Sequence, residues 1–286
     1  MEFVLGVLGG SGIYEIEGLE VLGHRQVDTP WGAPSDDIVH GRLADRELLF
    51  LPRHGRGHRH APHELNSRAN IAALKALGAT HLVSLSAVGS MRPEIKPGDV
   101  LVVDQFIDLT KKRINTFFES GLVAHVSMAD PVCPLLSKAL SQCARVAGAC
   151  VHVGGTYVCI EGPQFSTRAE SQLYRSWGVS VIGMTALPEA RLAREAELPY
   201  ATLALVTDYD CWHETEEDVS VEGVLLVLRE NAKLARNIVG ELSKNLPDPR
   251  HSNAYRALAH AIITEESART DAARERLRWL LGATPR

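Results

Sequence analysis

The chain has 286 residues, of which 45% are hydrophobic and 23% are charged, and its formal net charge is −5. This composition is typical of a globular protein, and the mild acidity argues against a protein that coats nucleic acid or adheres to an anionic membrane. Residues 1–9 contain an acid and no basic segment, and their apolar run is too short for a membrane span. Because the five cysteines form no CxxC pair, we expect a cytoplasmic protein with neither a disulfide framework nor a structural zinc ribbon.

Short runs rich in leucine and β-branched residues alternate along the chain with longer stretches of helical spacing. The runs predict strands at residues 3–8, 47–51, 81–86, 100–104, 156–160, 179–184 and 201–206. The stretches predict helices at residues 66–77, 134–147, 168–177, 188–196 and 219–245. This alternation indicates an α/β fold around a mixed or largely parallel sheet, in which ligands bind at the carboxyl ends of the strands.

A Pro-Asp-Pro sequence at residues 247–249 closes the last predicted helix and marks the one credible boundary in the chain. Beyond it, residues 253–263 and 265–281 alternate Leu or Ile with Arg and Glu at helical spacing. This pattern predicts amphipathic helices that pack on the main body or on a neighbouring subunit. We therefore expect a single domain, with a main body at residues 1–247 and a helical C-terminal extension at residues 248–286.

The first candidate site segment is Gly-Gly-Ser-Gly at residues 9–12, directly after the first predicted strand. Its glycines let successive backbone N–H groups approach an anion, and the Ser11 hydroxyl adds a donor. A dinucleotide fingerprint fails because Glu15 replaces its last glycine, the P-loop lysine is missing, and Ile13 is incompatible with a nucleophile elbow. The segment is therefore either a plain tight turn or a site for a small phosphate.

Residues 52–63 concentrate arginine and histidine just after the second predicted strand. A zinc site is disfavoured because arginines intervene between the histidines and repel a cation, and because His63 begins no HExxH motif. Nucleic-acid binding is disfavoured because the loop contains no Phe, Tyr or Trp. A solvated loop stays open as an interpretation, but Arg53 and His54 at the strand end are well placed for bidentate phosphate binding.

Small residues at positions 86–90 follow the third predicted strand and permit a ligand to approach the backbone closely. A Ser-His-Asp hydrolase built on Ser86 or Ser90 is disfavoured, because neither serine lies in an elbow motif and no single His or Asp is indicated as its partner.

Two later strand ends combine apolar and hydroxyl side chains. Phe165 and Ser166 follow one strand, and Met184 and Thr185 follow the next. This combination suits a base and a sugar, although each residue taken alone is more often core or a helix cap.

Asp208 and Asp210 follow the last strand of the main body. Taken alone, two acids separated by one residue are more often a turn with helix-capping carboxylates, and the sequence does not support glycosidase chemistry by this pair.

Seven ordered segments resemble the trimeric purine nucleoside phosphorylase family, and within it the methylthioadenosine phosphorylases. They are residues 9–12, 53–56, 97–99, 104–108, 161–165, 184–189 and 207–212, and the match runs from about residue 4 to about residue 245. The resemblance implies a central mixed sheet flanked by helices, a homotrimer or a dimer of trimers, and phosphorolysis of a purine nucleoside. It also implies phosphate as co-substrate and no metal or organic cofactor. A 6-oxopurine or broad-specificity nucleoside phosphorylase is the alternative enzyme, and a non-catalytic nucleoside- or phosphate-binding protein is the alternative class.

The resemblance also implies the residues of the site. Phosphate would be bound, in a small cationic pocket around Arg53, by Ser11, Arg53, His54, Ser86, the backbone of Ala87, and Thr185. The nucleoside would contact Phe165, Ser166, Met184, Asp208, Asp210, His125, Val221, Val224 and Leu225. In this arrangement Met184 lies against the ribose, Phe165 and Ser166 border the purine, and His125 reaches across the trimer contact towards the 5′ group.

Asp208 is the expected catalytic residue, because the leaving purine accumulates negative charge and is best expelled with N7 protonated. Asp208 would donate or share that proton, and Asp210 would hold the 6-amino group. The 6-oxopurine branch has Glu and Asn where this chain has Ser166 and Asp208. Since a carboxylate accepts from an amino group and repels a carbonyl oxygen, we expect adenine to be favoured over hypoxanthine or guanine.

The 5′ end of the substrate is expected to meet an apolar wall. Val221, Val224 and Leu225 occupy the helix face where the 6-oxopurine branch has a His that binds the 5′-hydroxyl. An apolar wall accepts a thioether and gives a hydroxyl no partner. The expected substrate is therefore 5′-deoxy-5′-methylthioadenosine, the expected products are adenine and 5-methylthioribose 1-phosphate, and acceptance of 5′-deoxyadenosine stays open.

Overall fold

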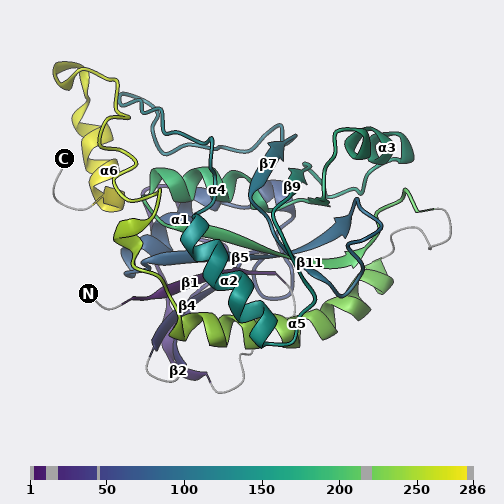
Figure 1. Ribbon diagram of the computed structural model, residues 1–286. Helices are drawn as coiled ribbons and strands as arrows, with labels where there is room; N and C mark the ends of the chain where they lie inside the picture. Colours follow the sequence, from purple (N-terminus) through teal and green to yellow (C-terminus); the bar gives the residue numbers. More distant parts are fainter. Residues whose placement is uncertain (1–2, 11–18, 44–45, 214–220, 282–286) are drawn as a thin grey trace.

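The structure is a computed structural model that describes residues 3–10, 19–43, 46–213 and 221–281, without the side chains of residues 221–226, 228–229 and 281. A mixed β-sheet runs through its centre (Figure 1). The described strands are β1 (Leu5–Gly9), β2 (Glu20–Arg25), β3 (Ile38–Leu43), β4 (Arg46–Pro52), β5 (His81–Ser90), β6 (Val100–Val102), β7 (Gln105–Asp108), β8 (Val151–Val153), β9 (Thr156–Cys159), β10 (Val181–Gly183) and β11 (Tyr200–Asp208).

The strand order along the sheet is β2-β3-β4-β1-β5-β10-β9-β7. A branch starts at β5, which also pairs with β11; β11 pairs in turn with β6, and β6 pairs with β8. Strands β4, β1, β5 and β11 run parallel to one another. By contrast, β10 runs antiparallel to β5. This reversal of direction beside β5 is the feature of the topology that positions the site described below.

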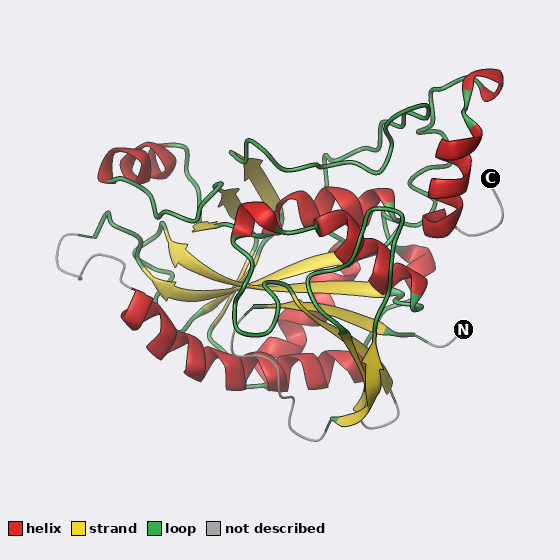
Figure 2. Cartoon of the chain, turned by 180° about the vertical axis from the view of Figure 1, so that it is seen from behind, coloured by secondary structure: helices red, strands yellow, loops and turns green. Residues whose placement is uncertain are grey.

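Helices cover both faces of the sheet, as Figure 2 shows from behind. Helices α1 (Ser67–Ala76) and α4 (Ala186–Glu195) contact each other on one face, and α2 (Pro134–Val146) and α5 (Val221–Lys244) contact each other on the opposite face. Strand β5 separates two apolar clusters, since Leu82 and Val88 belong to one and Val83 and Leu85 to the other. A strand buried on both faces explains why its sequence is a continuous apolar and small-residue run.

The α/β fold with a central mixed sheet is confirmed, and each predicted strand and each of the five helices predicted in the main body overlaps an observed element. The hairpin strands β2 and β3 and the short strands β7 and β8 were missing from the prediction. Strands β2 and β8 have no fully buried residue, and β7 is likewise half-buried or exposed along its length. Apolar periodicity therefore carries little signal for these edge strands.

The prediction for the C-terminal extension was half wrong, because residues 253–263 form a succession of turns and not a helix. Their backbone forms short-range turn bonds, such as the one from the amide of Ala257 to Ala254 O at 3.1 Å, and it also bonds to a distant loop. The amide of His125 donates to Ala261 O at 2.8 Å, and that of Ile263 donates to Val123 O at 3.0 Å. The second predicted helix exists as α6 (Asp271–Leu281), which buries Leu277 and Leu280 in the same apolar cluster as α1. The extension therefore packs on the main body of its own chain.

Among the described residues, no helix combines the length and the apolar character needed to cross a membrane.

A pH dependence of stability is expected from His81, which starts β5 and is 0% exposed. Its Nε2 lies 2.8 Å from the carbonyl oxygen of Pro247, and burial lowers its pKa to about 4. Because the unfolded chain has the ordinary pKa of about 6.5, it takes up a proton between about pH 6.5 and pH 4 while the folded protein does not, so stability is lost as the pH falls through this window. The loss approaches about 3 kcal/mol at the acid end.

Urea unfolding at neutral pH and near pH 4.5 checks this expectation. His81→Gln should reduce the difference in unfolding free energy between the two pH values, without abolishing it, because burial also lowers the pKa of His54 to about 4. An equal difference in the variant and the wild type would show that His81 does not titrate in this way.

Candidate active site

One edge of β5 is left open between its two neighbours. On that edge β1 pairs with β5 as far as Ser84, and β10 pairs with it from Gly89 onwards. Residues 85–88 therefore have no partner on this edge among the described strands, although β11 pairs with them on the opposite edge. Backbone groups alternate between the two edges of a strand, and the amide of Leu82 points to the opposite edge, where it donates to Pro199 O. The N–H group of Ala87, an odd number of residues away, therefore points into the gap.

A cavity of about 320 Å³ lies at this gap. Its lining comes from the carboxyl ends of β1, β4, β9, β10 and β11 and from the open stretch of β5. Of the residues expected at the site, the structure brings the following to the cavity: Arg53, His54, Ser86, Ala87, Phe165, Ser166, Met184, Thr185, Asp208 and Asp210.

The guanidinium of Arg53 is 1% exposed and already has partners. Its Nε and Nη2 both bond to the carboxylate of Glu189, and Nη2 also lies 2.6 Å from Ser84 Oγ. Its Nη1 donates to Leu85 O at 3.0 Å. The two-pronged face that would bind phosphate bidentately is therefore occupied by Glu189, and this carboxylate balances the arginine charge on which the expected small cationic pocket depended. One N–H of Nη1 stays available, since this nitrogen carries two protons and makes one bond among the described residues.

His54 is a neutral hydrogen-bonding group and not a second cation. Burial and the neighbouring Arg53 charge lower its pKa to about 4. Its Nδ1 lies 2.9 Å from the carbonyl oxygen of His60, so Nδ1 carries the proton and Nε2 is an acceptor. An acceptor at this position suits the P–OH of a protonated phosphate.

Three buried hydroxyls form a cluster at the gap. Continuing the antiparallel register of β10 brings Thr185 beside Ser86, and their side-chain oxygens lie 3.0 Å apart. The hydroxyl of Tyr157, from β9, lies 3.0 Å from Ser86 Oγ and accepts from the amide of Thr185 at 3.4 Å. Burial raises the pKa of Tyr157 to about 12, so the phenol keeps its proton. This cluster supplies uncharged donors that can rotate towards an anion.

Gly183 is required for Tyr157 to reach this position. A Cβ added to Gly183 would lie 2.1 Å from the Tyr157 hydroxyl oxygen. No side chain fits there while the tyrosine keeps its place, so the glycine before Met184 serves the hydroxyl cluster.

The two carboxylates lie at the end of β11, which pairs with the opposite edge of β5 from β10. Asp208 accepts hydrogen bonds from Thr207 Oγ1 at 2.7 Å and from the amide of Asp210 at 2.8 Å, so both its oxygens are oriented. A Cβ on Gly89 would lie 2.8 Å from Asp208 Oδ1, so this glycine gives the carboxylate its place. Asp210 is 6% exposed, and burial raises its pKa, with the neighbouring Asp208 acting in the same direction.

Apolar side chains also line the cavity. Phe165 is 47% exposed at the mouth of the cavity, and Met184 lines the cavity from the end of β10. The Oγ atom of Ser166 is buried and has no hydrogen-bond partner among the described residues. A buried hydroxyl without a partner is available to a ligand.

Arg113 holds together the two loops that carry these residues. Its Nη1 donates to the carbonyls of Met184 at 2.6 Å and Leu187 at 2.7 Å. Its Nη2 donates to Glu161 O at 2.7 Å and to Ile160 O at 3.3 Å. One guanidinium thus fixes the ends of both β9 and β10.

Several expected site residues are not brought to the cavity by the described structure. Ser11 lies outside the described residues, as do the side chains of Val221, Val224 and Leu225. His125 is exposed and does not line the cavity of its own chain.

Two other kinds of site were weighed in the sequence, a Ser-His-Asp hydrolase and a metal site in residues 52–63. Ser86 bonds to hydroxyls, and Ser90 Oγ donates to Arg92 O at 2.8 Å, so neither serine is paired with a histidine in the described hydrogen bonds. In the part of the chain that the structure describes, no three possible metal ligands of residues 52–63 come together.

No pattern in the sequence indicates a role for Tyr157, Glu189 or Arg113. Tyr157 is indistinguishable from an apolar core residue of a strand, and Arg113 lies outside every predicted element. Glu189 did stand in one of the seven segments, directly after Pro188, and a buried carboxylate partner for Arg53 could have been suspected there.

The chain is similar to known proteins along nearly its whole length. Residues 4–244 match the phosphorylase superfamily. The chain is 54% identical to the S-methyl-5′-thioadenosine phosphorylase of Geobacter sulfurreducens over 284 residues, which is 99% of each chain. It is 53% identical to the protein of the same name from Cereibacter sphaeroides over 272 residues, 94% of each chain.

Solved structures show the same likeness. A methylthioadenosine phosphorylase sourced from an Antarctic soil metagenomic library has a TM-score of 0.90 at 46% identity, over 98% of this chain and 99% of that one. Methylthioadenosine phosphorylase from Schistosoma mansoni, crystallised with adenine, has a TM-score of 0.86 at 38% identity, over 94% of this chain and 100% of that one.

Proposed function

The chain belongs to the phosphorylase superfamily, and on that premise we propose that its cavity converts 5′-deoxy-5′-methylthioadenosine and phosphate into adenine and 5-methylthioribose 1-phosphate. The enzyme is then a pentosyltransferase of the same kind as the relatives that share about half of its sequence. The observation that carries the proposal is one cavity with uncharged anion donors beside β10 and a pair of carboxylates at the end of β11.

We place phosphate in the gap beside β5. There the Ala87 N–H, the hydroxyls of Ser86 and Thr185 and the free N–H of Arg53 can donate to it, and His54 Nε2 can accept from its P–OH group. Phosphate attacks C1′ as the C1′–N9 bond breaks, and its negative charge stabilises the positive charge that develops on the sugar. Donors held in place before the reaction contribute several kcal/mol to such a step.

The departing purine takes the bonding electron pair and needs a proton at N7. We assign Asp208 to N7, since its two oriented oxygens lie at the end of β11, and Asp210 to the 6-amino group. Ser166 Oγ, which has no partner among the described residues, is assigned to the purine edge, and Phe165 and Met184 to its apolar faces and the sugar. A site that pairs carboxylates with an amino group leaves the carbonyl of a 6-oxopurine repelled and unpaired.

A substrate panel tests this assignment. Base release is measured from 5′-methylthioadenosine, 5′-deoxyadenosine, adenosine and inosine, each with and without phosphate. We expect turnover only with phosphate, the highest kcat/KM for 5′-methylthioadenosine, and the lowest for inosine. Faster turnover of inosine would overturn the assignment of the two carboxylates.

The active unit is proposed to be a homotrimer or a dimer of trimers, with His125 reaching the 5′ group in a neighbouring subunit. The exposed position of His125, outside the cavity of its own chain, supports this role. Sedimentation equilibrium gives the assembly state. A His125→Ala variant should raise KM for 5′-methylthioadenosine while leaving KM for phosphate unchanged, and a monomer with full activity would refute the shared site.

We also propose a cofactor requirement, a cellular location and a domain organisation for the protein. We assign no cofactor to the reaction, with phosphate as co-substrate. A cytoplasmic location is supported by the cysteines, all five of which are free thiols. Residues 1–247 are proposed as the catalytic body, with residues 248–286 as an extension of the same domain.

Tyr157→Phe should weaken phosphate binding specifically. The change removes the hydroxyl that bonds to Ser86 and Thr185 but keeps the ring in the core. Since one hydrogen bond contributes about 0.5 to 1.5 kcal/mol, we expect KM for phosphate to rise about two- to tenfold and KM for 5′-methylthioadenosine to change little. Initial rates at varied phosphate measure this, and an equal rise in both KM values would indicate general damage to the cavity.

A further inference from the structure

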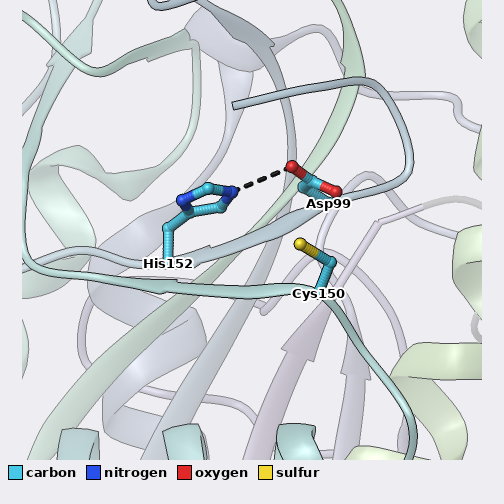
Figure 3. Close-up of side chains that lie close together, drawn as sticks. All are labelled: Asp99, Cys150 and His152. Atoms are coloured by element: carbon cyan, nitrogen blue, oxygen red, sulfur yellow. Dashed lines mark hydrogen bonds and ion pairs between the residues drawn. The ribbon is translucent and has the colours of Figure 1, made fainter. Parts of the chain in front are cut away.

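A second group of chemically active side chains lies outside the cavity, where β6 and β8 begin (Figure 3). These strands are parallel, with Val100 opposite Val151, so the residues before them, Asp99 and Cys150, are also neighbours. Cys150 and His152 are two residues apart along one strand and therefore project from the same face. The pairing of two strands thus brings a carboxylate, a thiol and an imidazole together.

The three side chains converge closely. His152 Nε2 lies 2.9 Å from Asp99 Oδ2, and one ligand atom from each of the three residues lies within 4.8 Å of the others. The amide of Lys96 donates to Asp99 Oδ2 at 3.0 Å, which fixes the carboxylate. Cys150 is exposed and the other two residues are half-buried, so an ion can reach the group from solvent.

We propose that Asp99, Cys150 and His152 form a binding site for one zinc ion. Zinc prefers thiolate, imidazole and carboxylate ligands, and three such ligands leave the fourth tetrahedral position for water. Bonds of about 2.0 to 2.3 Å place tetrahedral ligands about 3.3 to 3.6 Å apart, which side-chain rotation can reach from the separations seen here. This proposal does not depend on the function proposed above.

Zinc binding changes the protonation of two of the ligands. The thiol of Cys150 loses its proton to solvent and binds as thiolate, and His152 binds through Nε2 with its remaining proton on Nδ1. Lys96 faces the thiol as a positive charge, and its exposed side chain is free to turn into solvent when a cation binds.

Cobalt is the probe that tests the site, because a cobalt–thiolate bond gives a near-ultraviolet charge-transfer band. The full chain is freed of metal with a chelator, kept reduced without added thiols, and titrated with Co²⁺. We expect the band to saturate at one equivalent and to disappear when Zn²⁺ is added. Absence of the band overturns the proposal.

Three variants distinguish this site from other thiols. Cys150→Ser should abolish the band, and His152→Ala should weaken Co²⁺ binding at least tenfold. The matched control is Cys211→Ser, which changes the half-buried thiol and should leave the band intact. A band that survives Cys150→Ser, or Co²⁺ affinity that is unchanged in His152→Ala, contradicts the three-ligand site. Metal-free unfolding curves confirm that each variant folds.

Discussion

Asp208→Asn is expected to slow phosphorolysis of 5′-methylthioadenosine by about 10²- to 10⁴-fold, the range associated with loss of general acid help. The substitution preserves the size of the side chain. It therefore still fits beside Gly89, where a Cβ would lie 2.8 Å from Asp208 Oδ1. The substitution removes the carboxyl group that would donate or share the proton at N7, and it replaces one oxygen with an amide nitrogen that cannot accept a hydrogen bond. Steady-state kcat/KM with saturating phosphate measures the effect.

The same variant should shift the preference towards inosine, because N7 and the 6-position lie side by side on the purine edge, and an amide opposite N7 can donate to the 6-carbonyl that a carboxylate repels. The matched control is Asp271→Asn, an exposed carboxylate at the start of α6, which should leave both activities unchanged. If Asp208→Asn lowered the activity on both substrates by the same factor, Asp208 would not recognise the 6-position.

Glu189→Ala is expected to destabilise the fold by about 3 to 5 kcal/mol, because it leaves a buried guanidinium without its counter-ion. Glu189 is 1% exposed, and both its oxygens bond to Arg53, with one of them also accepting from Ser84 Oγ at 2.9 Å. Denaturant unfolding measures the loss. The matched control is Glu275→Ala, which breaks an exposed pair with Arg278 and should change stability little.

Glu189→Gln separates stability from phosphate binding. The amide keeps the shape of the side chain and one acceptor, so the variant should fold while holding Arg53 less firmly. KM for phosphate should then rise more than KM for 5′-methylthioadenosine. Unchanged stability in Glu189→Ala would mean that Arg53 finds other partners and that the ion pair does not organise the phosphate side of the site.

The sequence allowed the site to be located at strand ends because long buried strands have continuous apolar runs. Strands β5 and β11 are the clearest cases, and Ser86 and Asp208 could be placed from them. The gap beside β5 could not be predicted, because it depends on β10 running antiparallel to β5, and pairing direction leaves no mark in a three-residue strand.

Contacts between residues far apart in the sequence could not be predicted either. Arg53 and Glu189 are 136 residues apart, so a sequence that predicts a cation at the site does not show that its charge is balanced. Tyr157 illustrates the same limit, since its hydroxyl gains a function only when β9 and β10 bring it beside Ser86 and Thr185.

The fate of phosphate tests the central claim most directly. Phosphorus NMR of the full chain with 5′-methylthioadenosine and inorganic phosphate should show the phosphate signal fall and a sugar 1-phosphate signal rise in step with adenine release. Adenine release with the phosphate signal unchanged would mean that water, and not phosphate, attacks C1′, and would contradict the account.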